Sequence, residues 1–203
     1  MSDCCESACV VKVDEKYRKI LWIALVLNLA MFFVEVTAGL KGSSVSLLAD
    51  AIDFFGDSAN YALSIFVLGM SVRTKAKASL FKAACMGIFG IYVIGSVITG
   101  LLNSKIPEAH VMGLVGFLAL LTNVSVALML FKYRDGDSNM QSVWLCTRND
   151  AIGNIAVMLA ALGVFVTDSK LPDLLVASIM GILGITAATR VIKKARSELK
   201  QGI

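Results

Sequence analysis

The chain has 203 residues, of which 57% are apolar and only 17% are charged. This balance is typical of membrane proteins and argues against a water-soluble domain, because a soluble bundle of such apolar helices would have no polar surface. The net charge of +4 at pH 7 is modest and does not indicate nucleic-acid binding.

Apolar windows near the length needed to cross a ~30 Å hydrocarbon core occur six times along the chain. The first window begins too late and runs too long for a cleavable signal peptide. The connections are short, so we expect a tail at 1–18, a six-helix transmembrane unit at 19–192 and a tail at 193–203. The predicted fold is therefore an all-α integral membrane protein with six transmembrane helices. The six windows are 19–40, 44–70, 79–103, 109–133, 141–166 and 171–192.

The basic residues are distributed unevenly between the two sides of these spans. Fifteen of the 19 lysines and arginines fall in the two tails and the even-numbered connections, and only Lys41, Lys105 and Lys170 fall in the odd-numbered ones. By the positive-inside rule, both termini should be cytoplasmic. Three tail cysteines (Cys4, Cys5 and Cys9) would then stay reduced, either as a metal-collecting cluster or as plain thiols of a tail.

Acidic residues inside the spans are the most informative feature. Ten of the fifteen acids fall in predicted tails or loops, Asp173 among them, whereas a charge near the bilayer centre costs a few kcal/mol or more. Only Arg148 shares the membrane with the intramembrane acids, and it cannot neutralise them all. Some of them must be protonated, face water or bind a cation. These five acids are Glu35, Asp50, Asp53, Asp57 and Asp150.

Two pairs of potential ligands share one spacing. Asp53 and Asp57 are four residues apart, as are Cys146 and Asp150, so each pair lies on one face of its helix. If the two faces meet, three carboxylates and a thiolate suit a tetrahedral ion such as Zn²⁺ or Cd²⁺ better than Mg²⁺ or Ca²⁺. For Cys146 the alternative is a small apolar filler.

The second predicted span carries a specific resemblance. Its run GSSVSLLADA at 42–51, followed by Asp53 and Asp57, resembles the signature of the cation diffusion facilitator family. In the fifth span, Cys146-x3-Asp150 with Gly153 stands where that family has a His-x3-Asp pair. The resemblance implies a homodimeric exporter of divalent metal driven by protons. It also implies Asp53, Asp57 and Asp150 as ligands, with Cys146 in the position of the usual histidine.

The chain departs from the family pattern in two respects. The family commonly ends in a cytoplasmic metal-binding domain, whereas this chain ends about eleven residues after its last span, so we expect a short form that dimerises through its spans. A thiolate also makes the site softer, which favours cadmium or mercury over cobalt and manganese. The expected partners are the transported ion, protons and the lipid bilayer of a bacterial inner membrane, with no resident cofactor.

Several residues are expected to support the ligands. Asn149 and Asn154 could hydrogen-bond the carboxylates or join helices. Asp50 could orient the site or line a water path, or it could pair with Arg148. Glu35 is expected to hydrogen-bond a neighbouring helix.

Two other functions compete with efflux. One is a metal-binding membrane subunit or sensor that keeps the fold without transporting. The other is an intramembrane aspartyl hydrolase, but no motif beyond the paired acids supports an enzyme.

Overall fold

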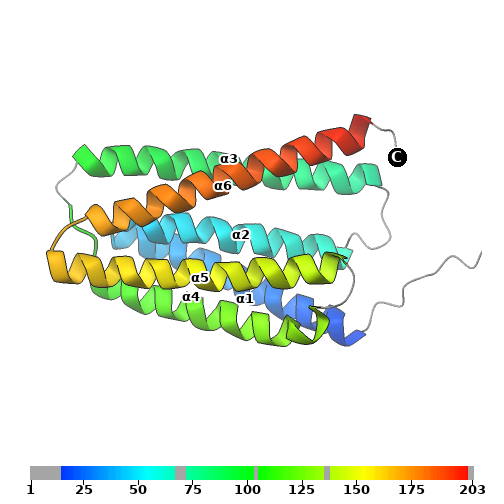
Figure 1. Cartoon of the computed structure of the whole chain (residues 1–203), viewed down its shortest axis with the longest axis horizontal. Helices are drawn as coiled ribbons and strands as arrows, with labels where there is room; N and C mark the ends of the chain where they lie inside the picture. Colours follow the sequence, from blue (N-terminus) through cyan, green and yellow to red (C-terminus); the bar gives the residue numbers. More distant parts are fainter. Residues whose placement is uncertain (1–14, 67–71, 103–104, 135–137, 201–203) are drawn as a thin grey trace, which may run out of the picture.

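The computed structural model describes residues 15–66, 72–102, 105–134 and 138–200, and it gives only the backbone for a few residues within these ranges, Cys146 among them. The predicted all-α fold is confirmed, because the described ranges form six long helices and no strand (Figure 1). The tail cysteines Cys4, Cys5 and Cys9 lie outside the described residues. The helices are α1 (Glu15–Lys41), α2 (Val45–Phe66), α3 (Val72–Leu102), α4 (Ala109–Leu130), α5 (Ser138–Thr167) and α6 (Leu171–Lys200), with a 3-10 turn, η1, at Phe131–Tyr133.

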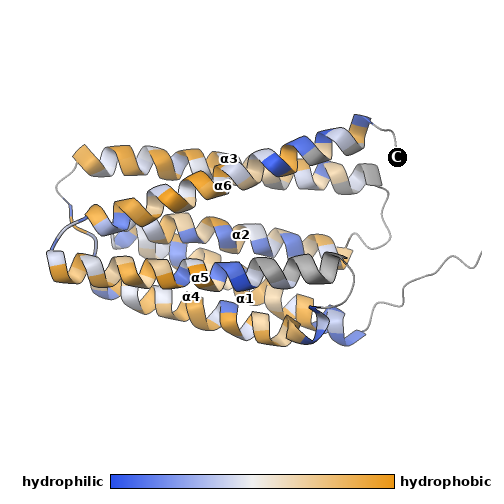
Figure 2. Cartoon of the chain, in the orientation of Figure 1, coloured by the Kyte–Doolittle hydropathy of each residue, from blue (hydrophilic) through white to orange (hydrophobic). Residues whose placement is uncertain are grey.

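Five of the six helices are long and apolar enough to cross a membrane; α2 is not one of them. It is as long as α4, at 22 residues, but its three aspartates add charge within the span. Thirteen of its residues are buried, compared with seven of the 27 in α1, so α2 is shielded by its neighbours. Figure 2 shows hydrophilic turns within α2 and α5 among mostly apolar helices.

The outer surface is apolar and the interior contains polar groups. On α1 the side chains of Val26 and Phe33 are 61% and 59% exposed, whereas Asn28 and Glu35 are 0% exposed. A helix in a water-soluble protein shows the opposite pattern. This arrangement is expected of helices whose outer faces meet lipid and whose polar side chains face the bundle interior.

The helices pack as two groups with α2 between them. The α3–α6 pair forms one group and α1, α4 and α5 form the other, and α2 contacts helices of both (Figure 1). The α3–α6 seam depends on small residues, because a Cβ at Gly90 would lie 2.7 Å from the Ile185 side chain and one at Gly181 would lie 3.0 Å from Ile94. This fits the general use of glycine at helix seams in membranes.

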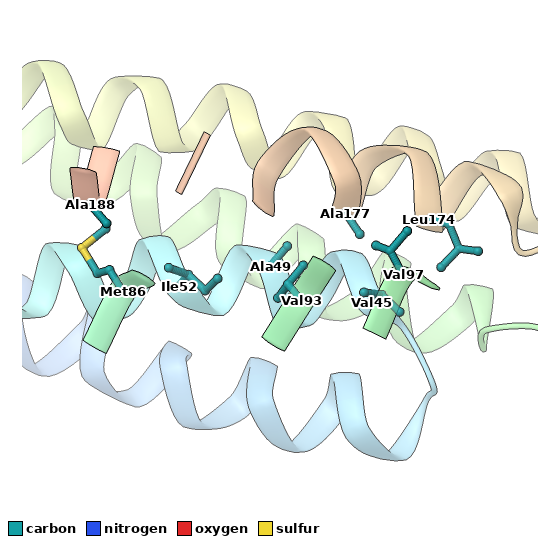
Figure 3. Packing of buried hydrophobic residues seen from close by; sticks show 9 residues of the cluster. All are labelled: Val45, Ala49, Ile52, Met86, Val93, Val97, Leu174, Ala177 and Ala188. Atoms are coloured by element: carbon teal, nitrogen blue, oxygen red, sulfur yellow. The ribbon is translucent and has the colours of Figure 1, made fainter. Parts of the chain in front are cut away.

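One face of α2 is wholly apolar. Val45, Ala49 and Ile52 pack with Val93 of α3 and Ala177 of α6, among other residues (Figure 3). Asp50 and Tyr61 of α2 lie on another side, where they hydrogen-bond residues of α5.

The first turn of α1 and the last turn of α6 lie at the same end of the bundle (Figure 1), as six antiparallel spans require. Both helices run beyond the predicted spans, starting at Glu15 and ending at Lys200. The membrane boundaries at 19 and 192 stay predictions.

Candidate metal site on the second and fifth helices

The start of α2 is fixed by a carboxylate from another helix. Asp173, in the first turn of α6, is fully buried. Its Oδ1 accepts hydrogen bonds from Ser44 Oγ (2.7 Å), Ser46 N (3.0 Å) and Ser46 Oγ (2.6 Å), and its Oδ2 accepts one from Val45 N (2.8 Å). Ser44 Oγ in turn accepts from Leu47 N (3.2 Å), which is the usual bond from an N-cap residue to the third residue of its helix.

This cap satisfies backbone N–H groups that every helix start leaves without an intrahelical acceptor, and it places negative charge at the positive end of the helix dipole. It explains two serines of the GSSVSLLADA run: Ser44 and Ser46 hold the beginning of α2 against α6. The expectation that Asp173 belongs to a loop is wrong, because its side chain points into the bundle rather than to solvent.

Asp50 lies in the second turn of α2 and is fully buried. Its Oδ2 accepts a hydrogen bond from Asn154 Nδ2 of α5 (2.7 Å), and Asn154 Oδ1 accepts one from Asn123 Nδ2 of α4 (2.9 Å). Three helices are therefore joined by one polar chain. Asn154 thus does hydrogen-bond an intramembrane carboxylate, although that carboxylate is Asp50 rather than a predicted ligand.

Arg148 and Asn149 lie away from these acids. Both side chains are exposed on α5, and Arg148 Nη2 donates to Asn149 Oδ1 (3.2 Å). The guanidinium also lies 5.3 Å from the ring centroid of Trp144. The alternative in which Arg148 pairs with Asp50 is therefore wrong. Asn149 precedes Asp150 by one residue, which turns it about 100° around the helix from the Asp150 face.

The predicted ligands of α2, Asp53 and Asp57, lie about one and two turns farther along the helix. Asp53 is half-buried and Asp57 is 5% exposed, and the two carboxylates are electrostatic neighbours. Tyr61 Oη donates to Asp57 Oδ2 (3.0 Å) and lies 2.7 Å from Thr147 Oγ1 of α5. Because the phenol has a single proton, Thr147 is the donor in the second bond.

Asp150 comes close to this group from α5. It is half-buried and interacts electrostatically with the Tyr61 hydroxyl, as Asp57 does. The Cys146 side chain lies outside the described residues. Among the described side chains, no group of three or more histidines, cysteines or acids is close enough to hold a metal ion. The structure thus brings Asp57 and Asp150 toward Tyr61, with Asp53 one turn before Asp57 on α2, and the described side chains do not close into a ligand set.

Sequence reasoning missed Tyr61, Thr147 and the capping role of Asp173. Tyr61 follows Asp57 by four residues and Thr147 precedes Asp150 by three, so helical spacing could have indicated both. Nothing in the sequence links Asp173 with Ser44, because the two are 129 residues apart.

Comparison with known proteins agrees with this architecture. Residues 21–200 match the family model described as the cation efflux transmembrane domain. The chain is 22% identical over 202 residues to the zinc transporter ZitB of Escherichia coli (strain K12), which covers 93% of this chain and 64% of that protein. It is 22% identical over 195 residues to the metal cation efflux system protein CzcD of Cupriavidus metallidurans, covering 90% of this chain and 62% of CzcD.

A shorter match of 28% identity over 123 residues links the chain to metal tolerance protein 1 of Arabidopsis thaliana, covering 54% of this chain and 31% of the plant protein. The chain spans less than two thirds of the length of each of these relatives. The family model nevertheless matches nearly all of it, with the six helices and the acidic second span in place. The chain therefore belongs to the cation diffusion facilitator family, whose members move metal cations across membranes.

Proposed function

We propose that this protein exports divalent transition-metal ions from the cytoplasm in exchange for protons, with Zn²⁺ or Cd²⁺ as the cargo. The observation that supports this proposal most strongly is the group of acidic side chains on α2. Asp53 and Asp57 lie inside a bundle whose outer surface is apolar, and Asp57 is joined through Tyr61 to the helix that carries Asp150.

Several carboxylates grouped in an apolar interior favour a function that needs their charge, because such groups are costly for a fold to keep. A dication that visits the site offsets that cost when it binds. Asp53, Asp57, Asp150 and Cys146 would act as ligands, and Tyr61 would orient Asp57 as outer-shell partners of metal ligands commonly do.

The donor set supports the choice of cargo. Three carboxylates and one thiolate suit a tetrahedral, borderline-soft ion, and the sulfur favours Cd²⁺ more than an imidazole would. The relatives' names point the same way, since one is a zinc transporter and another a metal cation efflux protein.

Exchange with protons follows from ligand chemistry. A carboxyl or thiol group must lose its proton before it binds a metal, so metal binding releases protons and protonation expels the metal. If the site opens alternately to the two sides, a proton gradient drives metal outward.

Transport in proteoliposomes tests the proposal. Purified protein is reconstituted with a zinc-sensitive dye inside and a pH gradient across the membrane. We expect dye signal that depends on both metal and gradient. If the protein binds metal but no flux is seen, the alternative of a metal-binding subunit or sensor is favoured. If neither metal binding nor flux is seen, the proposal that this protein handles metal ions is overturned.

Three associated features stay predictions. The chain pairs with a second copy through its transmembrane helices, it lies in a bacterial inner membrane, and both termini face the cytoplasm. The positive-inside distribution of lysine and arginine supports the last of these.

A further inference from the structure

Glu35 of α1 is a buried acid that the metal site does not use. Its side chain is 0% exposed, and no N–H or O–H of the described residues donates a hydrogen bond to either of its oxygens. The Oδ1 atom of Asp50, also 0% exposed, lacks a donor in the same way. Glu35 and Asp50 are within hydrogen-bonding reach of each other.

Two ionised carboxylates cannot form that contact, because each accepts hydrogen bonds and neither donates. One proton between them turns the repulsion into a strong hydrogen bond and halves the buried charge. The contact therefore requires that the pair hold a proton.

Among the described residues, the groups shown to act on the pair are acidic or neutral and none is a cation. The charged group that acts on Glu35 besides Asp50 is Asp53, from α2. The contacts from α5 and α4 are neutral: Asn154 donates to Asp50, and Asn123 donates to Asn154.

Two further buried amide oxygens of the bundle add to this surplus of acceptors. Asn123 Oδ1 of α4 and Asn28 Oδ1, two turns before Glu35 on α1, have no hydrogen-bond donor among the described residues. Buried acceptors without donors are rare and call for an explanation such as a bound hydrogen-bond donor. The ligand that fits an excess of acceptors with net negative charge is a proton, carried alone or on water, and not an anion.

The same geometry disfavours a second metal site. Glu35 and Asp50 lie within hydrogen-bonding reach of each other, and no group of three or more metal-binding side chains gathers among the described residues. A divalent transition metal needs about four ligands, which this pair cannot supply.

We propose that Glu35 and Asp50 form a proton-binding site separate from the metal ligands. The pair holds one proton when the metal site is empty. A dication bound at Asp53, one turn along α2 from Asp50, stabilises the doubly ionised pair, so the O–H bond breaks and the proton leaves to water. The release of the proton on metal binding rests on the proposed metal transport. The proton held by Glu35 and Asp50 in the absence of metal does not.

Infrared spectroscopy of the protein in lipid bilayers tests proton occupancy without metal. A protonated carboxyl gives a C=O band that shifts in deuterated water. At neutral pH the wild type should show this band, and Glu35→Gln should lose the intensity of one carboxyl, because glutamine keeps the shape without the proton. Asp168→Asn, at an exposed acid in the α5–α6 loop, should leave the band unchanged.

Absence of the band from the wild type, or an unchanged band in Glu35→Gln, would overturn the proposal. If Glu35→Gln fails to fold, Asp50→Asn gives a second test, since the asparagine oxygen can still accept from Asn154, and it should lose the same intensity.

Calorimetry with Zn²⁺ in buffers of different ionisation enthalpy tests the coupling. We expect the wild type to release one more proton per ion than Glu35→Gln, and Asp168→Asn to match the wild type. Equal proton release from all three proteins would overturn the coupling while leaving metal binding intact. A failure of the proposed function appears differently, as absence of metal flux in the wild type whatever the infrared result.

Discussion

The buried carboxylates at the start of α2 and in its middle differ in how many hydrogen bonds they accept. At its start, Asp173 accepts four hydrogen bonds, including two from backbone N–H groups. In its middle, Glu35 and Asp50 retain oxygens without a donor, and Asp53 and Asp57 lie beside each other. Among the described residues, both oxygens of Asp173 therefore accept hydrogen bonds, whereas both oxygens of Glu35 and the Oδ1 atom of Asp50 accept none.

The difference separates structural from functional acids. A carboxylate that accepts several N–H and O–H bonds stabilises the fold through those bonds. The oxygens of Glu35 gain no such bonds, and a buried acid of this kind calls for another explanation, such as a bound ligand. Sequence position does not separate the two kinds, because Asp173 and Glu35 both fall within predicted apolar windows, 171–192 and 19–40.

The largest effect should come from removing a metal ligand. Asp57→Asn and Asp150→Asn should each reduce Zn²⁺ transport in proteoliposomes by at least about 100-fold, above the range for loss of an outer-shell partner. In Asp57→Asn the new amide oxygen can still accept the bond from Tyr61, so the fold should persist with little change in thermal midpoint. Asp168→Asn serves as the matched control with normal transport. Near-normal transport in both ligand variants would place the metal site elsewhere.

The second effect concerns stability. Asp173→Ala removes all four bonds of the cap and leaves buried N–H groups without acceptors, which should lower the free energy of unfolding by about 3 kcal/mol. Asp173→Asn should lower the free energy of unfolding by less, about 1–2 kcal/mol. Its amide oxygen can keep the bonds that Oδ1 accepts, but its amide nitrogen cannot accept the bond from Val45 N. The measurement is thermal unfolding in detergent, again with Asp168→Asn as control. Equal midpoints for all three variants would contradict the role of the cap.

The fold could be predicted well from the sequence, and the site only in part. Apolar windows set the six helices, because lipid demands continuous apolar stretches with satisfied backbones. Helical spacing gave the shared face of Asp53 and Asp57. The contacts between helices depend on side-chain directions across the bundle, so the bond of Asp173 to Ser44 and the contact of Glu35 with Asp50 appear only in three dimensions.

A smaller effect should follow from Tyr61→Phe. This change removes the 3.0 Å hydrogen bond to Asp57 Oδ2 and the 2.7 Å hydrogen bond with Thr147 Oγ1, while the ring still fills its buried position. We expect transport to fall by about 10-fold, the lower end of what loss of an outer-shell partner costs. Tyr92→Phe, at an exposed position of α3, is the control. If both variants transport alike, Tyr61 does not orient Asp57.

The smallest effect should be a change in selectivity at Cys146. Cys146→His replaces a soft sulfur with an imidazole nitrogen and should lower the ratio of Cd²⁺ to Zn²⁺ transport without abolishing either, because both ions accept nitrogen ligands. The ratio is measured in one liposome preparation, so differences in protein amount cancel. Cys85→Ser, at the half-buried cysteine of α3, controls for the general loss of a thiol. An unchanged ratio in Cys146→His would mean that sulfur does not contact the metal, and the site would then consist of the carboxylates that α2 and α5 bring toward Tyr61.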